Sequence, residues 1–189
     1  MNIQDLLLTI NDFSRCGKKL DSVKAIVMHW TGNPMASAKA NRDFFENRKN
    51  GKAGYGSAHY IVGIDGEIIR CIPDNEIAYH VGSSQIDPKS GKIYTDYARD
   101  IFGKYAIDYK TLSPNLCTIG IEMCPVDSAG HYKDVTLESA SELVSSLLKN
   151  NRLKKENITT HYAIVGWKDC PRLWVNQPEL FSDFIKSIK

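Results

Sequence analysis

The stretch Val23-Lys24-Ala25-Ile26-Val27-Met28-His29-Trp30 decides the fold of this chain. It is almost wholly apolar and rich in branched residues, which is typical of a strand that other elements cover on both faces. Residues Ser37–Arg48 follow it without a helix breaker and carry apolar side chains at helical spacing. We therefore expect a buried strand that ends near His29, followed by an amphipathic helix.

Strands and helices alternate along the rest of the chain. Residues 59–64 and 67–72 flank Asp65-Gly66, a pair typical of the type I′ turn in a β-hairpin. Further strands are expected at residues 118–123 and 158–162, and further helices from an N-cap at Thr136 to Lys149 and from Pro178 onward. This order predicts an α/β fold with a mixed central β-sheet flanked by helices.

The length of 189 residues and the hydrophobic content of 42% predict one compact domain over residues 1–189. We regard residues 1–20 as an N-terminal extension, in which Ile3, Leu6, Leu7 and Ile10 suit a short helix. Residues 83–114 are polar and lack a regular period. Long stretches of this kind are often functional, so we expect a loop that borders a binding groove, with a short helix near residues 97–102.

The charge balance argues against several classes of partner. Lys and Arg number 24 against 22 Asp and Glu, which is too even for a nucleic-acid or membrane surface.

The N-terminus has no basic region or cleavage site of a signal peptide, and no apolar run reaches the roughly 18 to 20 residues of a membrane span. The odd number of cysteines, five, suits a reducing compartment. We expect a cytoplasmically synthesised monomer that binds neither nucleic acid nor membrane.

Three residues could together bind a metal ion. His29 ends one predicted strand, His161 ends another, and Cys170 follows in a loop that contains Pro171. A catalytic zinc site needs three such ligands and an open fourth position. Taken singly, each histidine is more often structural and each cysteine more often a small buried hydrophobe. The spacing alone leaves the zinc site and the structural role equally open.

Five segments, in order, resemble the type 2 N-acetylmuramoyl-L-alanine amidases, a family that includes phage endolysins, bacillus and clostridial autolysins and peptidoglycan recognition proteins. The segments are Ile26-Val-Met-His29-Trp-Thr, Ser57-Ala-His-Tyr, Ala78-Tyr-His80-Val-Gly, Thr118-Ile-Gly-Ile-Glu122 and His161 with Lys168-Asp-Cys170-Pro171. Each segment alone is a weak signal, but five in register are strong. The resemblance runs from about Phe13 to Pro171, and Phe13–Leu20 is most similar to the endolysin and autolysin branch.

The resemblance implies a fold, a cofactor and a reaction. The fold is a mixed sheet flanked by helices, with a zinc site in a groove at the edge of the sheet. One zinc ion would be bound by His29, His161 and Cys170. The reaction would be hydrolysis of the amide between the lactyl group of N-acetylmuramic acid and L-alanine, which lyses the cell wall.

The resemblance also implies roles for three further residues. Lys168 would stabilise the oxyanion, Glu122 would act as general base and acid, and His80 would contact the substrate. Some branches carry a tyrosine before the hairpin histidine, where this chain has Ala58, and the branch without it has a glutamate at the place of Glu122. The plainer alternatives are a solvated surface lysine, a strand-end carboxylate facing solvent and a loop histidine.

Two rival functions remain open at this stage. The first is a peptidoglycan-binding module without hydrolytic activity, which the intact Cys170 disfavours. The second is a zinc peptidase acting within the stem peptide, because a metal ion and Lys168 would serve any amide. Whichever of these functions the protein has, action on the wall would require its release through a holin-type pore, cell lysis or external addition.

Overall fold

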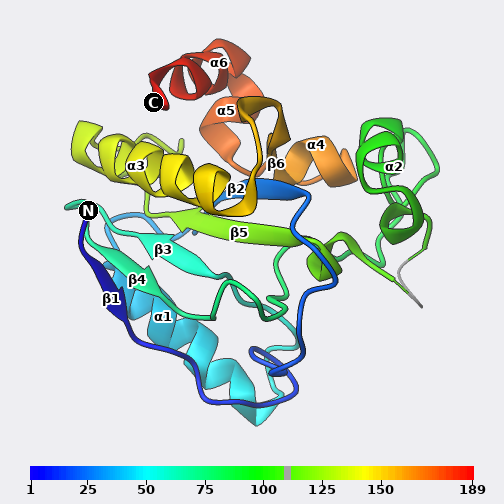
Figure 1. The fold of residues 1–189 in the computed structure, drawn as a ribbon, viewed down its shortest axis with the longest axis horizontal. Helices are drawn as coiled ribbons and strands as arrows, with labels where there is room; N and C mark the ends of the chain where they lie inside the picture. The colour runs from blue at the N-terminus through cyan, green and yellow to red at the C-terminus, as the bar shows by residue number, and fades with distance from the viewer. Residues whose placement is uncertain (109–111) are drawn as a thin grey trace.

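The computed structural model describes residues 1–108 and 112–189, and its centre is a six-stranded sheet flanked by helices (Figure 1). The strands are β1 Ile3–Asp5, β2 Ala25–Trp30, β3 Tyr60–Val62, β4 Ile68–Arg70, β5 Thr118–Met123 and β6 Ile158–Thr160. They lie in the order β1-β4-β3-β5-β2-β6. β3, β5, β2 and β6 run parallel, whereas β4 pairs antiparallel with β3 and parallel with β1. The predicted mixed α/β architecture is confirmed.

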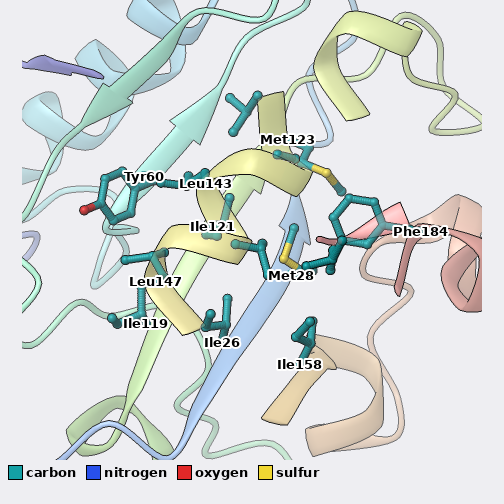
Figure 2. Packing of buried hydrophobic residues seen from close by; sticks show 14 of the residues in the cluster. Ile26, Met28, Tyr60, Ile119, Ile121, Met123, Leu143, Leu147, Ile158 and Phe184 are labelled. Atoms are coloured by element: carbon teal, nitrogen blue, oxygen red, sulfur yellow. The ribbon is translucent and has the colours of Figure 1, made fainter. Parts of the chain in front are cut away.

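One face of the sheet carries the largest apolar cluster, under two helices (Figure 2). The helices of the chain are α1 Ala38–Asn47, α2 Asp96–Phe102, α3 Asp134–Asn151, α4 His161–Val165, α5 Arg172–Asn176 and α6 Pro178–Ser187. Short 3-10 turns lie at η1 Arg48–Asn50, η2 Gly103–Ala106, η3 Pro114–Leu116 and η4 Lys155–Asn157. Met28 and Ile121 on the sheet pack against Leu143 of α3 and Phe184 of α6. This face therefore supplies much of the hydrophobic stabilisation.

The opposite face is divided between two smaller apolar clusters. α1 packs near β3 and β4 through a cluster that contains Ala38, Ile61 and Ile69. α2 and α4 pack near β2 through a cluster that contains Val27 and Phe102. The alternate residues of β5 between them are Thr118, Gly120 and Glu122, which pair with Ala25, Val27 and His29 of β2. A polar strip therefore lies between the two clusters.

The helix predicted in the first residues is wrong. Ile3–Asp5 form an edge strand, and the amides of Leu6 and Leu8 donate to the carbonyls of Arg70 and Cys71. Leu8 is 1% exposed, whereas Ile10, one of the four residues that suit the helical pattern, is 64% exposed. Pairing with β4 decides this segment, and that partner is distant in the sequence.

Two local details of the prediction also need correction. The hairpin is confirmed, but only Gly66 has a positive φ, +81°, and the Gly63 amide donates to the Glu67 carbonyl. The loop therefore has three residues rather than a two-residue type I′ turn. Thr136 does not cap α3, because the helix begins after Lys133 and the Thr136 hydroxyl donates to the Gly63 carbonyl.

Residues 83–114 contain more regular structure than a loop, although residues 109–111 lie outside the described part of the chain. The predicted helix near residues 97–102 is confirmed as α2. Thr95 caps α2 and donates to the Ala163 carbonyl, so the segment is attached to α4. Its role as the border of a groove stays a prediction. Among the described residues, no helix is long and apolar enough to span a bilayer.

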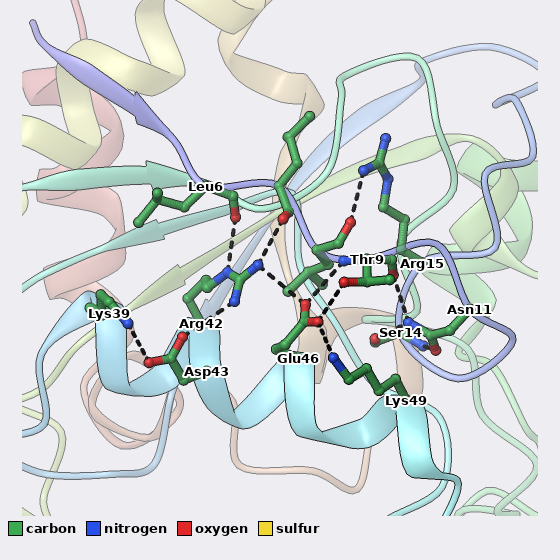
Figure 3. Close-up of polar contacts among 12 residues, drawn as sticks. Leu6, Thr9, Asn11, Ser14, Arg15, Lys39, Arg42, Asp43, Glu46 and Lys49 are labelled. Atoms are coloured by element: carbon green, nitrogen blue, oxygen red, sulfur yellow. Dashed lines mark hydrogen bonds and ion pairs between the residues drawn. The ribbon is translucent and has the colours of Figure 1, made fainter.

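A polar network joins the N-terminal segment to α1 (Figure 3). Arg42 donates to the carbonyls of Leu6 and Leu7 at 3.0 and 2.7 Å. Glu46 accepts from the amide and the hydroxyl of Thr9 at 3.0 and 2.6 Å, and it pairs with Lys49. Helix α1 thereby holds the chain that leads away from the edge strand.

Glu46→Gln should lower the free energy of unfolding by about 1 to 2 kcal/mol at pH 7, because hydrogen bonds to a charged group are stronger than neutral ones. Burial raises the pKa of Glu46, but hydrogen bonds from Lys49 and Thr9 outweigh it and lower the pKa from 4.5 to about 2. Such a carboxyl stabilises the fold above pH 4.5, and this contribution is lost as the pH falls through about 2. In urea unfolding, the difference in the free energy of unfolding between parent and variant should therefore shrink as the pH falls from 4.5 to about 2.

Asp43 on the same helix is the matched control. Its side chain is 43% exposed, against 14% for Glu46. Exposed ion pairs contribute little, so Asp43→Asn should change the free energy of unfolding by less than about 0.5 kcal/mol at any pH. Equal effects of the two substitutions would contradict the role of Glu46.

Candidate metal centre

Three buried side chains meet near the carboxyl end of β2. The Nδ1 atom of His29 lies 3.1 Å from Nδ1 of His161 and 3.6 Å from Sγ of Cys170. One possible ligand atom from each of the three residues lies within 4.8 Å of the other two. The structure thus brings together the three residues that the sequence predicts as metal ligands.

The sheet and one loop account for this convergence. β2 and β6 are parallel, and Met28 pairs with Thr160, so His29 and His161 follow at the same level. The prediction that His161 ends a strand is wrong. His161 begins α4, because the Thr160 hydroxyl caps that helix by accepting from the Ala163 amide. The Tyr162 amide donates to the Cys170 carbonyl at 2.9 Å, which returns the chain after α4 to the site.

Burial governs the ionisation of the three side chains. It holds the pKa of His29 well below its usual value, and the neighbouring His161 and His80 add to this effect. It lowers the pKa of His161 to about 3 and raises that of the Cys170 thiol to about 12. Both imidazoles are therefore neutral and able to bind a cation, and the thiol would release its proton on metal binding.

The donor set fits a zinc ion. Two imidazole nitrogens and one thiolate are typical ligands of catalytic zinc. In a tetrahedral site, the usual zinc–ligand lengths separate two nitrogens by roughly 3.3 Å and a nitrogen and a sulfur by roughly 3.6 Å. The separations from His29, 3.1 and 3.6 Å, are close to these values. Two facing Nδ1 lone pairs would also repel each other unless a proton or a cation lay between them.

Glu122 lies beside His29 on the neighbouring strand, and the two residues pair in register on the same face. Its side chain is half-buried, and Oε2 is enclosed without a hydrogen-bond partner among the described residues. Burial raises the pKa of Glu122 to about 8, although the positive charge of Lys168 opposes the shift. A carboxyl of this kind can exchange a proton near neutral pH.

Lys168 is exposed in the loop between α4 and Cys170. Its charge contributes to the pKa shifts of His29, His161, Cys170 and Glu122, so its field reaches the site. An exposed lysine close to a buried cluster could approach a ligand bound there. Its role toward an oxyanion stays a prediction.

His80 lies behind His29 rather than at the surface. Its side chain is buried, with Nδ1 at 3.0 Å from His29 Nε2 and Nε2 at 3.1 Å from Thr118 Oγ1. The predicted contact of His80 with a substrate stays a prediction. The sequence alone does not single out Thr118 as a site residue, although Thr118 opens one of the five segments that resemble the family and alternates with Glu122 along the strand.

Comparison with known proteins gives a consistent picture. The family model described as N-acetylmuramoyl-L-alanine amidase matches residues 19–173. A probable N-acetylmuramoyl-L-alanine amidase of Bacillus licheniformis is 34% identical over 95% of this chain, and the amidase BlyA of Bacillus subtilis is 33% identical over 96%. The chain covers 45% of the length of each of these relatives.

Solved structures share the fold. A mutant endolysin from Bacillus subtilis superposes with a TM-score of 0.69 at 22% identity, covering 100% of this chain and 99% of that one. The catalytic domain of XlyA superposes with a TM-score of 0.68 at 23% identity, covering 98% and 99%. At such identities the likeness supports the architecture and not the details of the site.

Proposed function

This chain belongs to the N-acetylmuramoyl-L-alanine amidase family, and we propose that it hydrolyses the amide between N-acetylmuramic acid and L-alanine in peptidoglycan. The observation that carries the proposal is the buried cluster of His29, His161 and Cys170, with the carboxyl of Glu122 beside it. We propose that this cluster binds one zinc ion, which would act as a Lewis acid toward the scissile carbonyl and activate water.

The residues of the chain then divide the work. Glu122 takes a proton from the attacking water and passes it to the departing amine of L-alanine, and its place opposite His29 on the neighbouring strand suits this role. The Lys168 ammonium stabilises the negative charge that develops on the carbonyl oxygen of the substrate. The protein acts as a monomer on the wall after release from the cytoplasm.

Digestion of purified cell walls followed by mass analysis of the products tests the proposal. The expected products are intact stem peptides with a free L-alanine amine and glycan strands with a free lactyl carboxyl. New amines elsewhere in the peptide would identify a zinc peptidase instead. Binding to walls without any soluble product would identify a recognition module.

Lys168→Ala should lower turnover by ~10² to 10³, the usual loss when one preorganised donor to an oxyanion is removed. Bound zinc should stay near the parental amount, because Lys168 is no member of the ligand cluster. The measurement is turnover per bound zinc on purified walls. Lys154→Ala, which removes a lysine with a side chain 79% exposed, serves as the control and should keep the parental rate. An unchanged rate for Lys168→Ala would show that Lys168 is a solvated surface lysine without a role in turnover.

A further inference from the structure

A chain of buried hydrogen bonds leads from a backbone carbonyl to His29. The Thr118 hydroxyl donates to the Pro114 carbonyl at 2.7 Å. Thr118 Oγ1 lies 3.1 Å from Nε2 of His80, and Nδ1 of His80 lies 3.0 Å from Nε2 of His29. Thr118 is fully buried, and His80 and His29 are 8% and 1% exposed, so water does not compete freely for these atoms.

The donor and acceptor of each of these hydrogen bonds follow from the first bond, in which the Pro114 carbonyl accepts. A carbonyl oxygen can only accept, so the single proton of Thr118 points to Pro114 and the Thr118 oxygen accepts from His80. His80 therefore carries its proton on Nε2 and, as a neutral ring, accepts at Nδ1. His29 must then donate from Nε2, which leaves its Nδ1 without a proton. That Nδ1 atom is the one that faces His161 and Cys170.

We infer that Thr118 and His80 are positioning residues that keep the proton of His29 on Nε2 and so leave Nδ1 free for the metal ion. The inference rests on the proposed metal site. Metal-binding histidines commonly donate their second ring N–H to a partner that orients them and fixes their tautomer. Here that partner is another imidazole, and a threonine hydroxyl in turn fixes its tautomer.

The surrounding backbone holds the His80 ring in this orientation. The side-chain oxygen of Asn115 accepts from the amides of residues 80, 81 and 82 at 3.1, 2.8 and 3.2 Å. Gly120 lies against the ring, because a Cβ atom there would be 2.5 Å from Cγ of His80. The ring is thus confined by contacts that do not involve the metal ligands.

Thr118→Val and Thr118→Ser form the decisive pair of variants. Valine has nearly the shape of threonine and suits a buried strand, but it can neither accept from His80 nor donate to Pro114. Serine keeps the hydroxyl. Long-range ¹H–¹⁵N spectra of the chelator-treated protein report which ring nitrogen of His29 carries the proton, and competition with a chelator gives the affinity for zinc chloride.

The parent and Thr118→Ser should show His29 protonated on Nε2. In Thr118→Val, His80 can turn its proton toward His29, so the Nδ1–H form of His29 should appear and zinc affinity should fall by roughly 10- to 100-fold. An unchanged tautomer and affinity in Thr118→Val would overturn the inference. A parent protein with His29 protonated on Nδ1 would overturn it too, even if the valine variant does not fold.

This readout is separate from the proposed function. If the parent protein releases no L-alanine amine from walls, the amidase proposal fails, whereas the tautomer of His29 in the metal-free protein still decides the positioning role. Conversely, an active enzyme with His29 protonated on Nδ1 keeps the amidase proposal and removes the role of Thr118 and His80.

Discussion

Cys170→Ser should release most of the bound zinc and abolish wall hydrolysis. A hydroxyl is a far poorer zinc ligand than a thiolate, and Sγ of Cys170 lies 3.6 Å from Nδ1 of His29 in the cluster. The loss of affinity should exceed the ~100-fold that removal of an outer partner can cost. Metal analysis and the clearing of a wall suspension measure the two effects, and a chelator should reproduce them in the parent protein.

Cys71→Ser provides the matched control for this substitution. Cys71 is also fully buried, but it lies in the apolar cluster beneath α1 and outside the ligand set. Burying a hydroxyl there should lower thermal stability and leave zinc content and turnover per zinc unchanged. Full lytic activity of the parent protein after removal of its metal would contradict the proposal that hydrolysis depends on a bound zinc ion.

Glu122→Gln should lower turnover per bound zinc by ~10² to 10⁴, the range that general acid–base catalysis contributes. Glutamine is nearly isosteric with glutamate but cannot take up the proton. Because Glu122 Oε2 has no hydrogen-bond partner among the described residues, replacement of the carboxyl by an amide should break no hydrogen bond of that atom. Thermal stability should therefore stay close to that of the parent.

Glu67→Gln should give the opposite pattern and serves as the control. The Glu67 carboxylate accepts from the amides of Ala38 and Asp65 at 3.2 Å, so it has a structural task at the start of α1. The variant should lose stability and keep its turnover per zinc. A Glu122→Gln rate within a few-fold of the parent would remove Glu122 from the mechanism.

The central strands could be predicted from the sequence because their apolar runs are local signals. β2 and β5 each read as a buried strand, and the Asp65-Gly66 pair indicated the hairpin between β3 and β4. β1 could not be predicted in this way, since its three residues become a strand only by pairing with β4. α4 and α5, with five residues each, are too short to show a helical period.

The candidate site was predictable as a set of residues but not as an arrangement. Resemblance to a family supplied His29, His161 and Cys170, which spacing alone left open. Their meeting depends on β6 pairing with β2, and the sequence separates these strands by more than a hundred residues. The contact of His80 with Thr118 has the same origin: it joins two segments that no local pattern relates.

Gly120 illustrates how far intolerance to substitution can extend from a reactive centre. In a mutational scan, positions that do not tolerate substitution are usually interpreted as contacts with substrate or metal. Gly120, however, is neither one of the proposed metal ligands nor one of the residues proposed to transfer a proton. Glycine is a poor choice for a buried strand on propensity alone. Any larger residue would displace the His80 ring, so natural variation should be confined at a position that carries no side chain of its own.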